Sequence, residues 1–382
     1  MTFELADILI DNLDFIESLG LSQHKLKVLY DIMYCRTEKL GRHSNKKCSN
    51  PDCKEEVISY NSCRNNHCPK CTGSKQIKWT ADRCNEILPV NYSHAVFRPP
   101  QCYSKLFENN PEDCYNMLFN SANETLKVLL TKNNSSKLKY GMIAALHTWD
   151  QKINYYSHLH CLIPEGQFDT ENNRWKNSNN KVLKKDILNV TFQKILAKKL
   201  IKWIRKNNYT FPGITEEYIT KKSKTVSKCV YIKKSIKNVT SVIKYLSTYT
   251  NKVAITNNRI KDYNGTDVKI SYVDRADGNK IKNETIKAEK LIKLFCLHIL
   301  PKKLPRVRYY GFLANSCKKK YLKVCNKLLE KSGNKLSKES QKAIESAIKL
   351  YESIGKPQLC KVCHKGFMIT TALYSGRYGP YC

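Results

Sequence analysis

Residues 157–164 read Ser-His-Leu-His-Cys-Leu-Ile-Pro, and the expected fold is built outward from this stretch. Alternate side chains of a β-strand face the same side, so His158 and His160 would converge while Leu159 faces a core. His147 lies in the preceding β-prone run, and an adjacent antiparallel strand would add its imidazole. Three neutral nitrogen donors with open coordination positions would bind a divalent ion that still accepts phosphate oxygens. By itself, a His-X-His pattern is also compatible with two structural histidines.

Two tyrosines downstream of this motif, Tyr245 and Tyr249, are four positions apart. On the helix predicted over 238–250 they would share one face, and both hydroxyls could reach one metal site. The same residues also fit an ordinary core stripe with Val242 and Leu246. Because the chain contains 23 tyrosines, the spacing alone does not separate these interpretations.

A second group of metal-ligand side chains lies upstream, between positions 35 and 71. Its density predicts structural zinc, with two tetrahedral sites as the first interpretation and one ion with spare cysteines as the alternative. The short-spaced pairs Cys48/Cys53 and Cys68/Cys71 are expected to form one site, and the remaining four residues the other. The eight candidate ligands are Cys35, His43, Cys48, Cys53, Cys63, His67, Cys68 and Cys71.

Near the other end, Cys360-Lys361-Val362-Cys363 is half of a zinc knuckle. Only His364 or Cys382 would be close enough in sequence to complete it, so a further zinc and two unliganded thiols remain equal alternatives.

The charge balance favours a polyanionic partner. Lys and Arg number 67 against 33 Asp and Glu, for a formal net charge of +34, and the basic residues run from Lys25 to Arg377. Such a charge distribution points first to nucleic acid. The N-terminal residues lack a basic secretory region, and no apolar run approaches the roughly 20 residues of a membrane span. We therefore expect a cytoplasmic, nucleoid-associated protein whose clustered cysteines bind metal instead of forming disulfides.

The hydrophobic patterns predict an α+β chain in four segments. Apolar residues at helical spacing favour helices over 3–34, and β-prone runs occupy 91–97, 142–149 and 155–163. The expected segments are N-terminal helices (1–34), a zinc-binding DNA-recognition module (35–87), a nuclease core (88–315) and a mostly helical tail with a short cysteine-containing part (316–382).

Five blocks in one unbroken order resemble the two-tyrosine HUH rolling-circle transposases of insertion sequences, which carry an N-terminal zinc-binding domain. Cys48 and Cys53 depart from that family, since four residues separate them where the family shows two. The blocks are Tyr60 to Cys71, Leu88 to Phe97, Leu146 to Trp149 with Ser157 to Pro164, Tyr245 to Ile255, and Pro305 to Asn315.

The resemblance implies an HUH core, in which helices flank an antiparallel sheet with the His-X-His strand at its centre. It implies magnesium or manganese at His147, His158 and His160. Should His147 not be a ligand, His94 is the next candidate by its place on an earlier strand, although a buried histidine bonded within the sheet is the favoured interpretation of His94. It also implies that Tyr245 and Tyr249 attack single-stranded or hairpin DNA at element ends and leave 5′-phosphotyrosine. The expected DNA contacts are Arg64, Lys70, Lys252, Arg259, Arg306 and Arg308.

Two further functions remain open on the sequence. The same chemistry could serve a plasmid or phage replication initiator or a relaxase, although relaxases carry their tyrosine before the histidines. A non-catalytic zinc-finger DNA-binding protein would need no His-X-His strand. Target DNA and host replication factors are the expected partners besides the element ends, with no membrane.

Overall fold

The computed structural model describes residues 3–131, 137–177, 183–225, 228–236, 241–242, 252–354 and 356–374. The expected α+β class is confirmed, because antiparallel sheets are flanked by helices. Among the described residues, no helix is both long enough and apolar enough to cross a membrane. The division into four segments stays a prediction.

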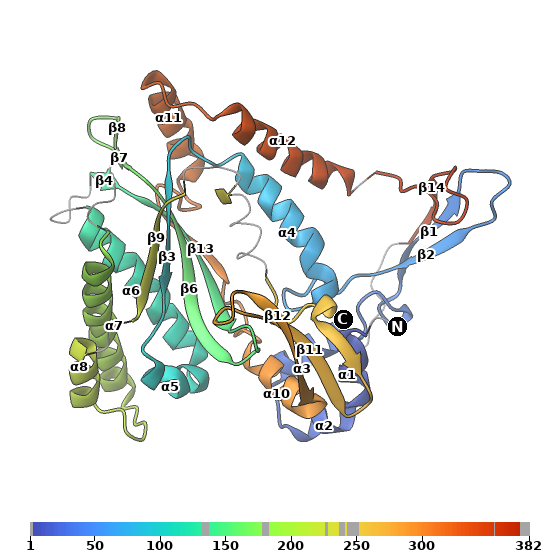
Figure 1. The fold of residues 1–382 in the computed structure, drawn as a ribbon, viewed down its shortest axis with the longest axis horizontal. Helices are drawn as coiled ribbons and strands as arrows, with labels where there is room; N and C mark the ends of the chain where they lie inside the picture. Colours follow the sequence, from blue (N-terminus) through green and yellow to red (C-terminus); the bar gives the residue numbers. More distant parts are fainter. Residues whose placement is uncertain are drawn as a thin grey trace.

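A five-stranded sheet forms the centre of the molecule, in the order β13-β5-β6-β3-β9, with every neighbouring pair antiparallel (Figure 1). The expected strands at 91–97, 142–149 and 155–163 are its three inner strands, and β6 is central. The bounds are β3 (Tyr92–Phe97), β5 (Gly141–Trp149), β6 (Tyr155–Pro164), β9 (Val230–Ile236) and β13 (Val307–Gly311).

The alternation along β6 separates one core face from a second face, which carries His158, His160 and the buried Leu162. Leu159 and Cys161 are fully buried in the largest hydrophobic cluster, together with residues of the helices beside the sheet. Phe97 of β3 packs on Phe192 with ring centroids 5.2 Å apart. The helices of this layer are α5 (Ser104–Asn109), α6 (Pro111–Leu130), α7 (Lys185–Asn207) and α8 (Glu216–Thr225).

Close approach of β13 to the preceding chain requires a glycine. Gly311 has a φ of +64°, and a Cβ there would lie 1.6 Å from the carbonyl oxygen of Tyr140. Only glycine fits this contact, which lets β13 pair with β5 at the edge of the sheet.

A second cluster lies under the N-terminal helices and a three-stranded sheet. Side chains of 5–33 pack there with those of 254–299, so distant parts of the chain share one core. Turns at 264–265 and 277–279 join its strands. The elements are α1 (Leu5–Asp11), α2 (Leu13–Ser18), α3 (Gln23–Met33), β10 (Ile260–Tyr263), β11 (Asp267–Asp274), β12 (Lys280–Lys287) and α10 (Ala288–Leu297).

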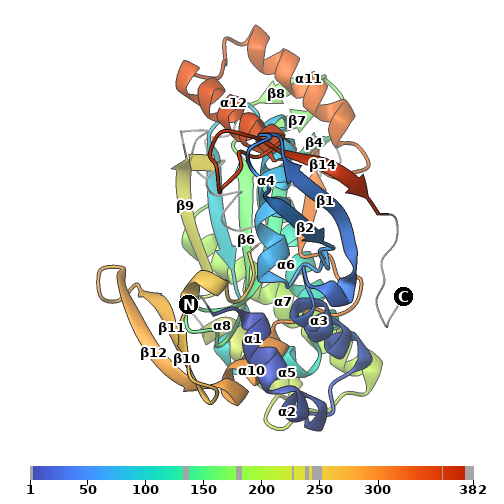
Figure 2. The ribbon, with the colours of Figure 1, turned by 90° about the vertical axis from the view of Figure 1, so that its right-hand side faces the viewer.

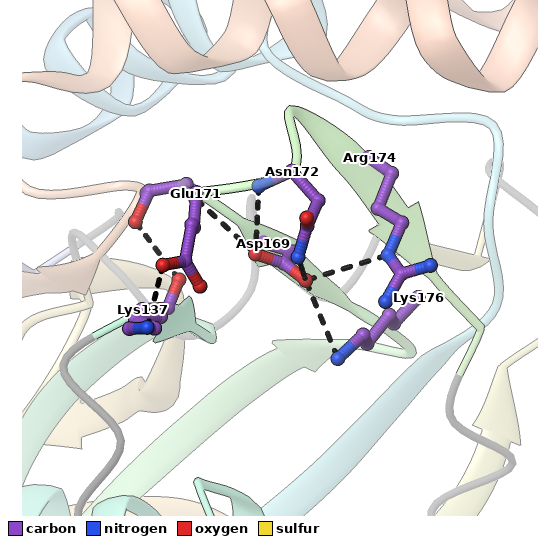
Figure 3. A network of polar contacts seen from close by, with 7 residues as sticks. Lys137, Asp169, Glu171, Asn172, Arg174 and Lys176 are labelled. Carbon is purple, nitrogen blue, oxygen red and sulfur yellow. Dashed lines mark hydrogen bonds and ion pairs between the residues drawn. The ribbon is translucent and has the colours of Figure 1, made fainter.

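The polar stretch after β6 forms β7 (Gln167–Asp169) and β8 (Arg174–Lys176), which make a small sheet with β4 (Leu138–Lys139). Asp169 is buried and accepts hydrogen bonds and ion pairs from Asn172, Arg174 and Lys176 (Figure 3). Bonding to Asn172 holds the pKa of the Asp169 carboxyl well below its usual range. This network adds polar contacts to a hairpin whose Phe168 and Trp175 also pack in a hydrophobic cluster.

An arm extends from one end of the molecule (Figures 1 and 2). It carries a three-stranded sheet in the order β14-β1-β2, so a strand from the C-terminal part pairs with the N-terminal hairpin. α12 lies along α4 between this sheet and the central body. The elements are β1 (Arg42–Cys48), β2 (Glu56–Tyr60), α4 (Pro69–Cys84), α11 (Lys318–Lys331), α12 (Lys338–Ser353) and β14 (Met368–Leu373).

Candidate functional site: a histidine centre and two cysteine clusters

Three histidines converge on one face of the central sheet, opposite the face that carries Leu159 and Cys161. His147 of β5 lies directly opposite His158 of β6, and His160 follows two positions later on the same face. One nitrogen of each ring lies within 4.8 Å of the others, and each of the three residues is at most 8% exposed. The antiparallel register that the sequence predicts therefore brings these imidazoles together.

Hydrogen bonding fixes which nitrogen each ring presents. Nδ1 of His158 lies 2.8 Å from the carbonyl oxygen of Tyr156, so Nδ1 must donate and Nε2 keeps its lone pair. Nε2 of His158 and Nε2 of His160 are 3.1 Å apart. Burial lowers the pKa of His158 to about 4 and that of His160 well below its ordinary value. Both rings are therefore neutral near pH 7, which is the form that binds metal.

His94 of β3 orients one of these rings. Its Nε2 lies 3.1 Å from Nδ1 of His160, and the two rings stack with centroids 5.3 Å apart. If His160 offers Nε2 to a metal, its Nδ1 must carry the proton and donate to His94. His94 is thus placed behind a candidate ligand, whereas His147 completes the convergent set.

The three histidines face an open cavity of 370 Å³. Its other walls are the β5–β6 turn and the turn between β11 and β12, which brings the exposed Arg275 to the cavity. Lys252 also lines it, and Arg275 and Lys252 are close enough to lower the pKa of His158 further. The cavity thus combines three neutral nitrogen donors with a basic rim. This donor set fits a divalent cation that retains open positions for oxygen ligands.

Tyr245 and Tyr249 lie outside the described residues. The chain before them is described at Val242, which is buried in a hydrophobic cluster with Ile143 and Leu162 of the central sheet. The chain after them is described from Lys252, which lines the histidine cavity. The role of both tyrosines stays a prediction.

Three of the residues expected to contact DNA have hydrogen-bond partners within the protein. The Arg259 guanidinium donates to the backbone oxygens of Ser271, Ala254 and Gln151. Two other guanidinium groups also donate within the protein: that of Arg306 to the carbonyl oxygens of Lys252 and Asn66, and that of Arg308 to Oδ1 of Asn116. These three arginines therefore connect parts of the fold, and their contact with DNA stays a prediction.

The other three expected contacts differ in exposure. Lys70 forms a 2.5 Å ion pair with Glu4 and donates to the carbonyl oxygen of Cys35, so it also has internal partners. Arg64 is exposed, and Lys252 faces the cavity. A role in DNA contact stays a prediction for all six residues.

The first cysteine cluster consists of Cys35, Cys63, Cys68 and Cys71. Cys35 follows α3, whereas Cys68 caps α4 and Cys71 lies in its first turn, where the helix dipole favours thiolate. Sγ of Cys71 lies 3.4 Å from Sγ of Cys35 and 3.6 Å from Sγ of Cys63. Four convergent thiols of this kind fit tetrahedral zinc.

The second cluster consists of Cys48, Cys53, Cys360 and Cys363. This grouping corrects the expected division, in which Cys48 and Cys53 joined Cys68 and Cys71. The reason is the length of β1: its seven residues carry Cys48 roughly 20 Å from the start of the strand, away from the base of α4.

Neither His43 nor His67, the two histidines expected to bind zinc, belongs to a cysteine cluster. His43 is exposed on β1. His67 accepts from the backbone N–H of Leu300, and its Nδ1 lies 3.3 Å from Nη2 of Arg306. His67 therefore links the zinc module to the chain that leads into β13, which corrects its expected role as a zinc ligand.

Sequence reasoning missed Arg275 and the partners of the Cys360/Cys363 pair. Arg275 is one of many basic residues, and only the position of its turn brings it to the histidines. For the cysteines the sequence did contain a signal, because Cys48/Cys53 and Cys360/Cys363 are two short-spaced pairs that each need two more ligands for tetrahedral zinc. Combining Cys48/Cys53 with Cys360/Cys363 would have completed one tetrahedral set.

Known proteins share both the core and the zinc module. Residues 141–320 match a family described as "Putative transposase", and residues 10–98 match the "Transposase zinc-binding domain". No solved structure matches the chain.

Two relatives extend the likeness over most of the chain. One is "Putative transposase y4qJ" of Sinorhizobium fredii, 31% identical over 374 residues, which cover 94% of this chain and 92% of the relative. The other is the "Transposase for insertion sequence element IS801" of Pseudomonas savastanoi pv. phaseolicola, 24% identical over 80% of this chain and 74% of the relative. The chain therefore belongs to the IS91-type transposases of insertion sequences, with the transposase zinc-binding domain of that family at its N-terminal end.

Proposed function

We propose that this transposase is a metal-dependent tyrosine nuclease of the HUH type, which cuts and rejoins single-stranded DNA at the ends of a rolling-circle element. The observation that carries the proposal is the convergence of His147, His158 and His160 on an open, basic cavity. A transposase acts on DNA, and the net charge of +34 suits that substrate. We extend the proposal to nucleoid association on the same grounds.

The histidine centre would hold magnesium or manganese through three neutral imidazole nitrogens. When bound, the ion supplies charge neutralisation and orientation at a phosphodiester. The protein's own part is to hold the rings: Tyr156 fixes the tautomer of His158, and His94 that of His160. Lys252 and Arg275 at the cavity can bind the phosphates on either side of the cleavage point.

Tyr245 and Tyr249 are the proposed nucleophiles. The phenol oxygen of one tyrosine attacks phosphorus, the bond to the 3′ oxygen breaks, and that oxygen leaves as a hydroxyl after taking a proton. The product is a 5′-phosphotyrosine, whose energy is conserved until a 3′ hydroxyl attacks it and rejoins the strand. Lys252, three positions after Tyr249, lines the histidine cavity, which supports a tyrosine acting there.

The decisive experiment is detection of a covalent protein–DNA adduct. Full-length protein is incubated with labelled single-stranded DNA containing element ends and manganese, and then run on a denaturing gel. Wild-type protein should form an adduct, and the double variant Tyr245→Phe/Tyr249→Phe should form none although it folds and binds DNA. Tyr30→Phe/Tyr34→Phe is the matched control, since it removes two hydroxyls at the same spacing from a stacked pair in the N-terminal helices.

The histidine variants test the metal centre separately. His158→Ala and His160→Ala should each abolish the adduct and leave most DNA affinity, because distributed basic side chains supply that affinity. His43→Ala, an exposed histidine outside the clusters, should behave like wild type. An adduct that forms equally well with the double Phe variant, or in EDTA with zinc retained, would contradict the proposed chemistry.

A further inference from the structure

The second cysteine cluster joins an N-terminal and a C-terminal segment of the described chain. Cys48 and Cys53 belong to the β1–β2 hairpin, whereas Cys360 and Cys363 follow α12, and the matched zinc-binding domain ends at residue 98. We propose that these four cysteines hold a structural zinc ion that fastens the C-terminal segment onto the zinc module. The ion would be shared between the two segments and distinct from the ion at the first cluster.

The distances between the sulfur atoms suit tetrahedral zinc. Sγ of Cys48 lies 3.5 Å from Sγ of Cys363, and Sγ of Cys53 lies 3.8 Å from Sγ of Cys360. A tetrahedron with Zn–S bonds near 2.3 Å has edges of roughly 3.8 Å. All four sulfur atoms lie within 4.8 Å of one another, so one ion can contact each of them.

Backbone groups already point at these sulfurs. The N–H of Asn50 donates to Sγ of Cys48, and the N–H of Gly366 donates to Sγ of Cys363, both at 3.4 Å. The first cluster has the same feature, because the N–H of Asn65 donates to Sγ of Cys63. Such donors stabilise thiolate and orient metal-bound cysteines.

Gly366 is packed directly against the cluster. A Cβ at this position would lie 2.5 Å from Sγ of Cys48 and 2.6 Å from the backbone nitrogen of Asn50. Any side chain would therefore displace a sulfur or the knuckle backbone. The close approach shows that the two segments are fitted to each other around the four thiols.

Little else holds this end of the arm together. Within the described residues, the β14-β1-β2 sheet contributes no member to the three hydrophobic clusters, and Ile369 and Leu373 of β14 are 52% and 81% exposed. A three-stranded sheet without a hydrophobic face is not expected to be stable alone. Metal binding would supply the missing folding energy, as in other small zinc modules.

The ion would also close a two-helix arm. α4 leaves the zinc module towards the central sheet, and α12 runs back beside it (Figures 1 and 2). At the body end, Leu322 and Leu329 of α11 are buried in the cluster that also contains Ile87, just after α4. At the outer end, the cysteine cluster and the β1–β14 pairing join the segment before α4 to the segment after α12. The zinc ion therefore fixes the position of the module relative to the body.

Zinc stoichiometry tests the site in full-length protein purified under reducing conditions. Wild-type protein should contain two zinc ions per chain, and Cys360→Ser/Cys363→Ser should contain one. Cys102→Ser/Cys317→Ser is the matched control, because it removes two partly exposed cysteines outside the clusters and should keep both ions. The same zinc content in the Cys360→Ser/Cys363→Ser variant as in wild type would overturn the proposal.

A second measurement needs no variant. Thiol alkylation followed by peptide mass spectrometry should label Cys360 and Cys363 only after a chelator is added, whereas Cys102 and Cys317 label equally in both cases. After chelation, trypsin should cut the segment that joins α12 to β14, where Lys361 and Lys365 are exposed. Labelling of Cys360 and Cys363 without chelator, or disulfides among the four cysteines in reduced protein, would exclude the zinc ion.

Discussion

Substitution of Arg306 by lysine tests whether this arginine connects the zinc module to the histidine cavity. Nη1 of Arg306 donates to the carbonyl oxygen of Lys252 at 2.7 Å and to that of Asn66 at 3.4 Å. Nη2 lies 3.3 Å from Nδ1 of His67, and the guanidinium covers the ring of Trp149 at 5.7 Å. One planar group thus contacts the zinc module, the cavity wall and a strand of the central sheet.

The expected loss of stability follows from the number of partners. A lysine keeps the charge but offers a single ammonium, which can reach one of these acceptors and cannot stack like a guanidinium. Hydrogen bonds to charged groups contribute about 1.5–3 kcal/mol each. Because lysine would leave one or two of these hydrogen bonds unmade, Arg306→Lys should lower the free energy of unfolding by about 2–4 kcal/mol. Burial lowers the pKa of Arg306 to about 10, so the wild-type residue stays charged at neutral pH.

Urea unfolding and DNA affinity, measured on the same protein, distinguish the two roles. Arg306→Lys should shift the unfolding midpoint clearly, with DNA affinity at fixed salt changing little. The matched variant Arg64→Lys, at an exposed arginine, should leave the midpoint unchanged. Unchanged stability of Arg306→Lys together with a large loss of DNA affinity would refute the structural role and restore Arg306 as a DNA contact.

Four further outcomes can be measured. His147→Ala should abolish the manganese-dependent DNA adduct on a denaturing gel, as expected of the third ligand; normal adduct formation would exclude it. Arg275→Ala should reduce the salt dependence of single-stranded DNA binding by a slope of about 0.7, since the variant removes one exposed phosphate-binding group; an unchanged slope would argue against contact. Cys68→Ser should remove the ion at the first cluster, seen as lower zinc content with altered circular dichroism, and full zinc content would count against that site. Burial lowers the pKa of His298 to about 4, so its contribution to stability is present above about pH 6.5 and is lost as pH falls towards 4. Unfolding midpoints measured across this range should depend less on pH for His298→Gln than for wild type. The same pH profile in both proteins would contradict this role of His298.

Local periodicity in the sequence was enough to predict one part of the site. His158 and His160 share a face because a strand alternates with a period of two, and a short connection pairs that strand with the one carrying His147. The same kind of reasoning predicted the zinc module from the density of cysteines. In the Cys-Pro-Lys-Cys sequence that ends at Cys71, both cysteines lie at the start of one helix, as local spacing requires.

Which distant groups meet depends on the packing of the whole chain. Cys48 is joined with Cys363 because β1 carries it outward and β14 returns beside that strand, a pairing that no local spacing encodes. His94 lies behind His160 because β3 is the neighbour of β6 in the sheet. Arg306 likewise has internal partners that its sequence neighbours do not reveal. Local rules fix the direction of a side chain. Its partners depend on how segments hundreds of positions apart pack together, because this packing decides whether a polar group lies beside an acceptor, a sulfur atom or solvent.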